Sequence, residues 1–334
     1  MGEFAVNYDT IQNALASIRR VVTRTPILTN QDLDQLVGGR VFVKAENLQR
    51  TGAFKFRGAM YRISSLNTDE RKKGVVAFSS GNHALALAEA GAHLEVSIAV
   101  IVPKDIPAIK LSAIRARGAE VIFFDRSTDD RFEMVARIAS DRGSIIVPPY
   151  DDRHIITGQG TLAAEVSEQL ELELGVRHLD QAIVCCSGGG LAAGCITVLK
   201  ERFPEIDFVT AEPDGFDDMA RSLVSGKPET NKQRDGSVCD ALLAPTPGSI
   251  TFPILHAKGA RGVSATDEDV MRAMQFVAAS FKMVVEPGGA VALAALLSGA
   301  IDAKDKSTLV VVTGGNVDLD TYSRAMSWTP KRSD

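Results

Sequence analysis

The chain alternates between two patterns of apolar residues. Short runs rich in valine and isoleucine are almost continuously apolar, as expected for parallel strands that are covered on both faces. The longer segments between them have helical patterns. Strands are predicted at Val41–Val43, Gly74–Phe78, Val96–Val102, Val121–Phe124, Ile145–Val147, Gln181–Cys185, Phe208–Ala211 and Leu309–Val312. Helices are predicted at Asn82–Ala92, Pro107–Arg117, Asp129–Asp141, Gly160–Glu171, Leu191–Phe203, Asp267–Phe281 and Gly288–Gly299.

The order of these elements predicts an α/β protein. Strand and helix follow each other along most of the chain, which favours parallel sheets with right-handed crossovers. Thr266 and Asp269 have the spacing of a capping box at the start of one predicted helix. The segment Ser225–Asp240 is rich in glycine, lysine, asparagine and aspartate, and it is predicted to be a surface loop.

Composition narrows the class of protein. The 334 residues suggest one large or two modest domains, and the formal net charge is −5 without a basic block. A nucleic acid or a membrane surface is therefore not an expected partner. A small-molecule substrate is expected instead. The N-terminus lacks a signal-peptide pattern, and the most apolar stretches, 96–103 and 284–298, are too short or too interrupted to span a bilayer. The four cysteines do not have the sequence spacing of zinc ligands. They are predicted to be buried thiols in the core of a cytoplasmic enzyme.

Lys55 is the first residue that suggests catalysis. It lies in the sequence TGAFKFRGA at 51–59, between two phenylalanines. A partly desolvated lysine has a lowered pKa because its charged form loses solvation. The neutral amine can then form an imine with an aldehyde. An ordinary surface lysine at the start of a helix would show the same local pattern.

Three turns after predicted strands have the composition of ligand sites. SSGNH at 79–83 lies between a strand and a helix, where free N–H groups can bind a carboxylate. SGGG at 187–190 lets successive N–H groups wrap a phosphate, although it matches neither the Walker nor the dinucleotide pattern. TGGN at 313–316 places a hydroxyl where it could bond a neutral ring nitrogen. Each turn alone is also compatible with a helix cap or a structural turn.

Together and in this order, the four segments resemble the fold-type II pyridoxal 5′-phosphate (PLP) enzymes, the tryptophan synthase β-like class. They are most similar to the serine/threonine dehydratase and serine racemase family, from RTPI at 24–27 to GGNVD at 314–318. The resemblance implies two domains, each with a mostly parallel sheet covered by helices. Residues 1–48 and 147–334 would form the large PLP-binding domain, and residues 49–146 the small domain. A short helix near Asp9–Val21 and a homodimer are also expected.

The resemblance implies a role for each motif residue. Lys55 matches the family lysine that forms the Schiff base with PLP. Ser80 matches the serine racemase residue that acts as acid and base on the opposite face of Cα, where many threonine dehydratases have alanine. The implied cofactor-binding residues are Phe54, Lys55, Asn82, Ser187, Gly188, Gly189, Gly190, Glu286 and Thr313. The implied substrate-binding residues are Ser80, Gly81, Asn82, His83 and Arg131.

Two further matches concern charge. Arg131 matches a serine racemase arginine that reaches a bound dicarboxylate, because a guanidinium suits a second carboxylate. It could equally pair with a neighbouring aspartate on a helix surface. Glu212 and Asp218, with the carbonyl of Phe216, match a divalent-cation site for Mg²⁺ or Ca²⁺, and oxygen ligands suit such hard cations. A helix cap beside a strand-end carboxylate is the alternative.

This chain differs from the family's usual sequence at two places. Ser187 stands where the family's phosphate loop usually begins with glycine, and its hydroxyl could add a phosphate contact. Ala84–Leu85 stands where serine racemase has a glutamine that contributes to nucleotide binding, so activation by ATP is in doubt.

The resemblance implies a PLP-dependent ammonia-lyase. It would convert a small amino-acid substrate with a β-hydroxyl, first of all L-threonine or L-serine, to a 2-oxo acid and ammonia. A dehydratase for 3-hydroxyaspartate or phenylserine, and a serine racemase with side elimination, are alternatives within the family. A β-replacement enzyme and a non-enzymatic PLP or amino-acid sensor are alternatives outside it. The S-x-G-N-H loop argues against cysteine synthase, and intact Lys55, Asn82 and Thr313 argue against a sensor.

Overall fold

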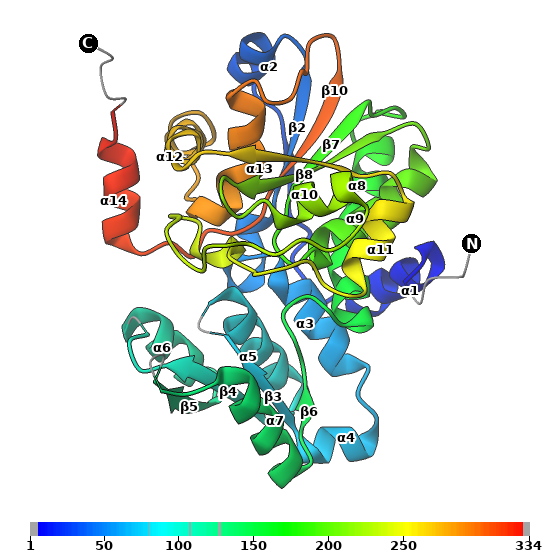
Figure 1. Cartoon of the computed structure of the whole chain (residues 1–334). Helices are drawn as coiled ribbons and strands as arrows, with labels where there is room; N and C mark the ends of the chain where they lie inside the picture. Colours follow the sequence, from blue (N-terminus) through cyan, green and yellow to red (C-terminus); the bar gives the residue numbers. More distant parts are fainter. Residues whose placement is uncertain (1–5, 80, 107, 126–127, 330–334) are drawn as a thin grey trace.

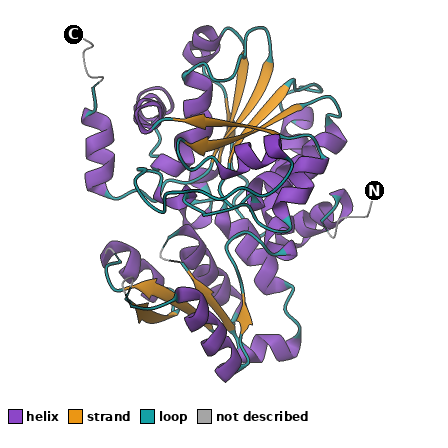
Figure 2. Ribbon diagram, in the orientation of Figure 1, coloured by secondary structure: helices purple, strands orange, loops and turns teal. Residues whose placement is uncertain are grey.

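The computed structural model describes residues 6–79, 81–106, 108–125 and 128–329, and its strands form two separate sheets (Figures 1 and 2). The six-stranded sheet has the order β1-β2-β10-β7-β8-β9, and the four-stranded sheet has the order β5-β4-β3-β6. The strands are β1 (Ile27–Leu28), β2 (Arg40–Ala45), β3 (Val75–Phe78), β4 (Ile98–Pro103), β5 (Glu120–Phe124), β6 (Ile145–Ile146), β7 (Gln181–Cys185), β8 (Asp207–Pro213), β9 (Arg261–Ala265) and β10 (Ser307–Val312). Every strand pairing among these, apart from β1 with β2, is parallel. The predicted α/β class is confirmed.

Helices surround both sheets. In Figure 1, α13 covers one face of the six-stranded sheet, while α8 and α9 cover the other. The α-helices are α1 (Tyr8–Ile18), α2 (Gln31–Val37), α3 (Lys55–Ser64), α4 (Thr68–Lys73), α5 (Asn82–Leu94), α6 (Ala108–Arg115), α7 (Arg131–Arg142), α8 (Arg153–Leu172), α9 (Gly190–Arg202), α10 (Asp218–Ser225), α11 (Thr251–Ala257), α12 (Asp267–Phe276), α13 (Pro287–Leu297) and α14 (Leu319–Ser327). The predicted capping box of Thr266 and Asp269 opens α12, and a single π-helical turn, Val277–Phe281, follows it.

The strand interiors explain why the sheets form. The middle strands β4, β7 and β10 are buried along almost their whole length, which is why their sequences are continuously apolar. The four cysteines are all free and buried, as the sequence predicts. No helix in the described part of the chain is long and apolar enough to cross a membrane. The strands of the smaller sheet fall between residues 75 and 146, while the domain boundaries given above stay a prediction.

Candidate active site

Lys55 begins α3 directly after a tight turn. Thr51 and Gly52 have φ of 67° and 75°, in the left-handed region that reverses the chain after β2. Ala53 then forms a bridge with Gly314, and the N–H of Phe54 donates to the carbonyl of Thr313 at 3.0 Å. The residues that precede Lys55 are therefore fixed to the end of β10.

The amine of Lys55 is enclosed. Its Nζ donates to the carbonyl of Pro149 at 2.6 Å and lies 5.1 Å from the centre of the Phe54 ring. Burial lowers the pKa of Lys55 to about 8, as the apolar sequence around it predicts. A substantial fraction of the amine is therefore neutral near pH 8, which both imine formation and proton abstraction require.

Thr313 and Cys185 form an uncharged pair near Lys55. Their side-chain oxygen and sulfur atoms are 3.3 Å apart at the ends of the neighbouring strands β10 and β7, and either can donate. Burial raises the pKa of Cys185 to about 11, so the thiol stays protonated. A group bound against Thr313 would therefore meet a neutral hydroxyl beside a neutral thiol.

The turn after β3, the start of α13 and the turn after β10 meet at Asn82. Its Nδ2 donates to Glu286 at 2.6 Å, and its Oδ1 accepts from Asn316 at 2.8 Å. Burial raises the pKa of Glu286 to about 7, although the Asn82 bond partly offsets this. A Cβ on Gly314 would collide with the Glu286 carboxyl, which explains the glycine. Asn82 is thus held from both sides by partners more than 200 residues away.

His83 is buried and neutral. Its Nε2 lies 3.0 Å from the carbonyl of Val147. Burial, followed by the charge of Lys55, lowers the pKa of His83 to about 3. The side chain predicted to bind substrate therefore carries no charge, and it helps to fix the turn after β3 against the end of β6.

The glycine loop at 187–190 wraps around the N-terminus of α9. Gly189 has φ of 93°, and a Cβ on Gly188 would collide with the Tyr150 ring. The carbonyl of Gly188 accepts from Thr251 Oγ1 at 2.6 Å, so the loop is held from outside. Ser187 Oγ accepts from the N–H of Ala244 at 3.1 Å, so this hydroxyl also anchors the loop. Within the described ranges, the N–H groups of Gly188 and Gly189 have no hydrogen-bond partner, which leaves a cradle for an anion.

The helices around Lys55 begin without side-chain caps. No side chain caps α3, α5 or α9, whereas α1, α2, α4, α7, α8, α12 and α14 are capped by asparagine, aspartate or threonine. The first N–H groups of a helix lack intrahelical partners and carry partial positive charge. Uncapped N-termini therefore favour negatively charged ligands at this site.

The pyridoxal-phosphate dependent enzyme family matches residues 18–314 of the chain. This chain belongs to that family. It is 35% identical to a serine racemase of Schizosaccharomyces pombe over 320 residues, which cover 96% of this chain and 97% of that protein. It is also 35% identical to an L-threo-3-hydroxyaspartate ammonia-lyase of a Pseudomonas species, covering 95% and 97%. The crystal structure of a Dictyostelium discoideum serine racemase superposes with a TM-score of 0.87 at 37% identity, covering 94% of this chain and all of that one.

The site of this PLP-dependent enzyme fits its cofactor. The glycine cradle and the uncapped start of α9 offer N–H donors to a phosphate. Lys55 offers an amine whose lowered pKa suits attachment to an aldehyde. Thr313 offers a neutral partner to a ring nitrogen. Phosphate, aldehyde and ring nitrogen are thus each matched by a group of the chain.

Two predicted residues remain, Arg131 and Ser80. Arg131 begins α7, and its guanidinium carbon lies 5.1 Å from the ring centre of Phe78 and 5.0 Å from that of Phe132. Phe78 ends β3, so Arg131 lies beside the strand that leads into the SSGNH turn. Ser80, predicted as the second catalytic residue, lies outside the described residues, while Gly81 is described and a Cβ added to it would meet no atom within 4 Å.

The predicted cation ligands Glu212 and Asp218 lie near Cys186, the residue that precedes the glycine loop. Both carboxylate oxygens of Glu212 accept backbone N–H groups, from Met219 at 3.0 Å and Ala220 at 2.7 Å. This is the helix cap that the sequence left as an alternative. Asp218 accepts from Asn231 at 2.6 Å, but its Oδ2 is buried without a partner, and burial raises its pKa to about 7. Across the described part of the chain, no three histidine, cysteine, aspartate or glutamate side chains gather as metal ligands.

The segment after β6 also shapes the site, and the sequence analysis did not select it. The carbonyl of Pro149 accepts from Lys55, and the Tyr150 ring packs against Gly188. Asp151 accepts the N–H groups of Ser249 and Ile250 at 2.9 and 2.8 Å. The signal was its position, because PPYDD at 148–152 follows a predicted strand as the other three motifs do.

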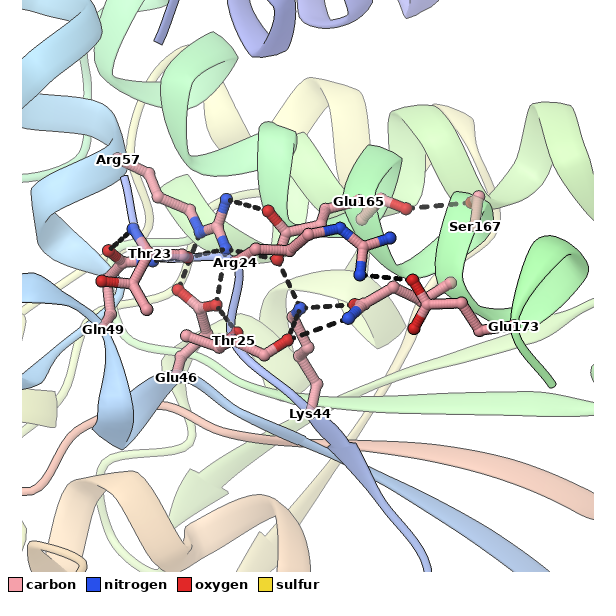
Figure 3. Close-up of polar contacts among 12 residues, drawn as sticks. Thr23, Arg24, Thr25, Lys44, Glu46, Gln49, Arg57, Glu165, Ser167 and Glu173 are labelled. Atoms are coloured by element: carbon pink, nitrogen blue, oxygen red, sulfur yellow. Dashed lines mark hydrogen bonds and ion pairs between the residues drawn. The ribbon is translucent and has the colours of Figure 1, made fainter. Parts of the chain in front are cut away.

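A buried charge network anchors the helix that carries Lys55. Arg57, two residues later, is fully buried and donates to Glu46 through Nε and Nη2, both at 2.8 Å. It also donates to Glu165 on α8 at 2.9 Å, and Glu165 accepts from Lys44 at 2.6 Å. Figure 3 shows these four side chains converging from β2, the short turn directly after it, α3 and α8. The two positive and two negative charges balance, which is the condition for burying them.

Proposed function

We propose that this enzyme eliminates the β-hydroxyl of an α-amino acid and releases a 2-oxo acid and ammonia, with L-serine and L-threonine as the first substrates. The observation that carries the proposal is the enclosed amine of Lys55, with a pKa of about 8, beside uncapped helix N-termini and the neutral Thr313–Cys185 pair. The named activities of the relatives, racemases and ammonia-lyases of β-hydroxy amino acids, belong to the same chemistry.

The residues divide the work as follows. PLP, when bound, supplies an electron-withdrawing ring that stabilises negative charge at Cα of an attached amino acid. The N–H groups at the start of α5 hold the substrate carboxylate. Asn82, the first residue of α5, is held in place by its hydrogen bonds with Glu286 and Asn316. The neutral amine of Lys55 accepts the Cα proton as general base. The hydroxyl of Thr313, as an uncharged partner, would leave the ring nitrogen of the cofactor unprotonated, which would favour prompt loss of the β-hydroxyl.

A second candidate substrate is 3-hydroxyaspartate. Arg131 lies against Phe78 at the end of β3, beside the turn that would hold the first carboxylate. Its guanidinium could bind a second carboxylate in a bidentate manner. An ammonia-lyase for this substrate is among the relatives at 35% identity. Arg131→Met should then reduce kcat/KM for 3-hydroxyaspartate and leave that for serine nearly unchanged.

We keep the remaining expectations as predictions with their own tests. Ser80→Ala should abolish any racemisation and spare much of the elimination, and an equal loss of both would contradict that role. Glu212, Asp218 and the carbonyl of Phe216 are proposed to bind Mg²⁺ or Ca²⁺, because Asp218 offers an unpartnered buried oxygen. A homodimer and a cytoplasmic location remain predictions, for light scattering and cell fractionation to test.

The experiment that tests the proposal is a panel of substrates. Purified protein with PLP and Mg²⁺ is supplied with both enantiomers of serine and threonine, the 3-hydroxyaspartates and phenylserine, and 2-oxo acid release is measured. Release from serine or threonine supports the proposal, and release from 3-hydroxyaspartate alone selects the second candidate. Cofactor bound without any product from the panel would refute the elimination and favour β-replacement or a sensor.

A further inference from the structure

Helix α8 touches two neighbouring helices through glycines. A Cβ on Gly158 would lie 2.8 Å from the Cα of Gly58 on α3. A Cβ on Gly160 would lie 3.0 Å from the carbonyl oxygen of Gly194 on α9. Glycine is unfavourable inside a helix, so its presence at these two positions indicates that backbone contact with both neighbours is required.

Gln159 stands between these two glycines and points into the wedge between α3 and α9. Its Cγ and Nε2 lie 2.9 and 3.2 Å from the position that a Cβ on Gly58 would take. Its Oε1 lies 2.8 Å from the corresponding position on Gly190, the first residue of α9. The amide therefore lies between the helix that carries Lys55 and the helix that begins at the glycine loop.

This amide has no partner in the fold. The side chain is 1% exposed, and neither Oε1 nor Nε2 has a hydrogen bond to any part of the chain that the structure describes. Gln169, ten residues later on α8, is equally buried but accepts from Lys44 at 2.7 Å and donates to the carbonyl of Thr25 at 3.0 Å. A buried amide without partners destabilises a fold relative to an apolar side chain of similar size. Its presence at position 159 therefore indicates a ligand.

The surroundings select an anion as that ligand. The amide adjoins Gly190 at the uncapped N-terminus of α9, and the free N–H groups of the glycine loop directly precede this residue in the chain. Both features favour negative charge. The amide oxygen faces Gly190 and the NH₂ faces Gly58. A half-turn about the last side-chain bond exchanges the two groups and brings the NH₂ donors to the anion. We infer that Gln159 is a side-chain donor to the phosphate group of the cofactor. The inference rests on the proposed placement of that phosphate in the 187–190 loop.

Gln159→Leu tests this, with Gln169→Leu as the matched control on the same helix. PLP and pyridoxal, which lacks the phosphate, are titrated into the cofactor-free proteins, and binding is followed by absorbance. Gln159→Leu should weaken PLP binding about 10- to 100-fold, the range for one charge-assisted hydrogen bond, and leave pyridoxal binding unchanged. The melting temperature of the cofactor-free variant should equal or exceed that of the wild type. Gln169→Leu should lower the melting temperature and preserve the ratio of the two affinities.

Two results would overturn the inference. One is wild-type PLP affinity in Gln159→Leu, and the other is an equal loss of affinity for PLP and pyridoxal, because only a phosphate contact separates the two ligands. Gln159→Glu is a second test variant, for the case that Gln159→Leu does not fold. A buried carboxylate there should repel the phosphate and weaken PLP binding further than leucine does, again without effect on pyridoxal. If the wild type itself prefers pyridoxal or binds neither, the proposed phosphate site fails as well.

Discussion

The buried network around Arg57 allows one prediction to be worked out in detail. Arg57→Met removes the guanidinium that bonds both oxygens of Glu46 and both oxygens of Glu165. Lys44 is then the single remaining cation, and its Nζ is already bonded to Glu165. Burial alone would raise the pKa of Glu46, but the Arg57 guanidinium holds that pKa below its usual value. Glu46 would be left as a buried carboxylate without its ion-pair partner, although the Thr25 hydroxyl still donates to it at 2.5 Å.

The expected loss in the free energy of unfolding follows from this imbalance of buried charge. Breaking a buried ion pair from one side costs about 3–5 kcal/mol, out of a total of about 5–15 kcal/mol for a typical domain. The double variant Arg57→Met/Glu46→Gln restores neutrality, because the Lys44–Glu165 pair remains. The double variant should lose less free energy of unfolding than Arg57→Met and Glu46→Gln lose in sum, by about 1–3 kcal/mol.

Urea unfolding of the cofactor-free protein, followed by circular dichroism, measures these free energies. Arg57→Lys is the matched control, since it keeps the charge and loses the bidentate contact with Glu46. The free energy of unfolding of Arg57→Lys should lie between that of the wild type and that of Arg57→Met. A loss below about 1 kcal/mol for Arg57→Met, or additive losses in the double variant, would refute the reasoning that charge balance stabilises this network.

Three further predictions concern the site itself. The rate at which the cofactor-free protein attaches PLP covalently should rise with pH to a midpoint near 8 and then level off, because only the neutral amine of Lys55 reacts; a midpoint near the ordinary lysine value of about 10.4 would contradict the enclosed amine. Gly188→Ala should weaken PLP binding at least about tenfold in an absorbance titration without unfolding the protein, since a Cβ there meets the Tyr150 ring and shifts the glycine loop, which we propose to bind the phosphate. Unchanged affinity would contradict that role of the loop. Mg²⁺ or Ca²⁺ should raise the melting temperature of the wild type but not of Asp218→Asn, measured by differential scanning fluorimetry, and an equal rise in both would place the cation elsewhere.

The sequence predicted most of the parallel strands because burial on both faces makes them continuously apolar. The same signal failed for β9 (RGVSA at 261–265), which lies at the sheet edge and is only partly buried. It also placed the start of α8 seven residues late, at Gly160 instead of Arg153. The glycines at 158 and 160 lower helix propensity, and only their contacts with α3 and α9 explain them.

The motifs around Lys55 could be found because each follows a strand and carries distinctive residues. The structure brings Asn82, Glu286, Thr313 and the glycine loop around the start of α3, although no local pattern pairs positions so far apart. The partners of Arg57 were not predictable for the same reason, since 11 and 108 residues separate it from Glu46 and Glu165. Charged residues in a sequence ordinarily indicate surface, and only the fold shows that these are buried together.

The most direct test of the account compares wild type and Lys55→Ala in the release of 2-oxo acid from L-serine and L-threonine with saturating PLP. The account predicts release by the wild type and a loss of at least about a thousandfold in Lys55→Ala, since Lys55 is the residue proposed both to attach the cofactor and to act as the general base. Borohydride reduction of the wild type should fix the cofactor on the peptide that contains Lys55. Undiminished release by Lys55→Ala would contradict the central claim.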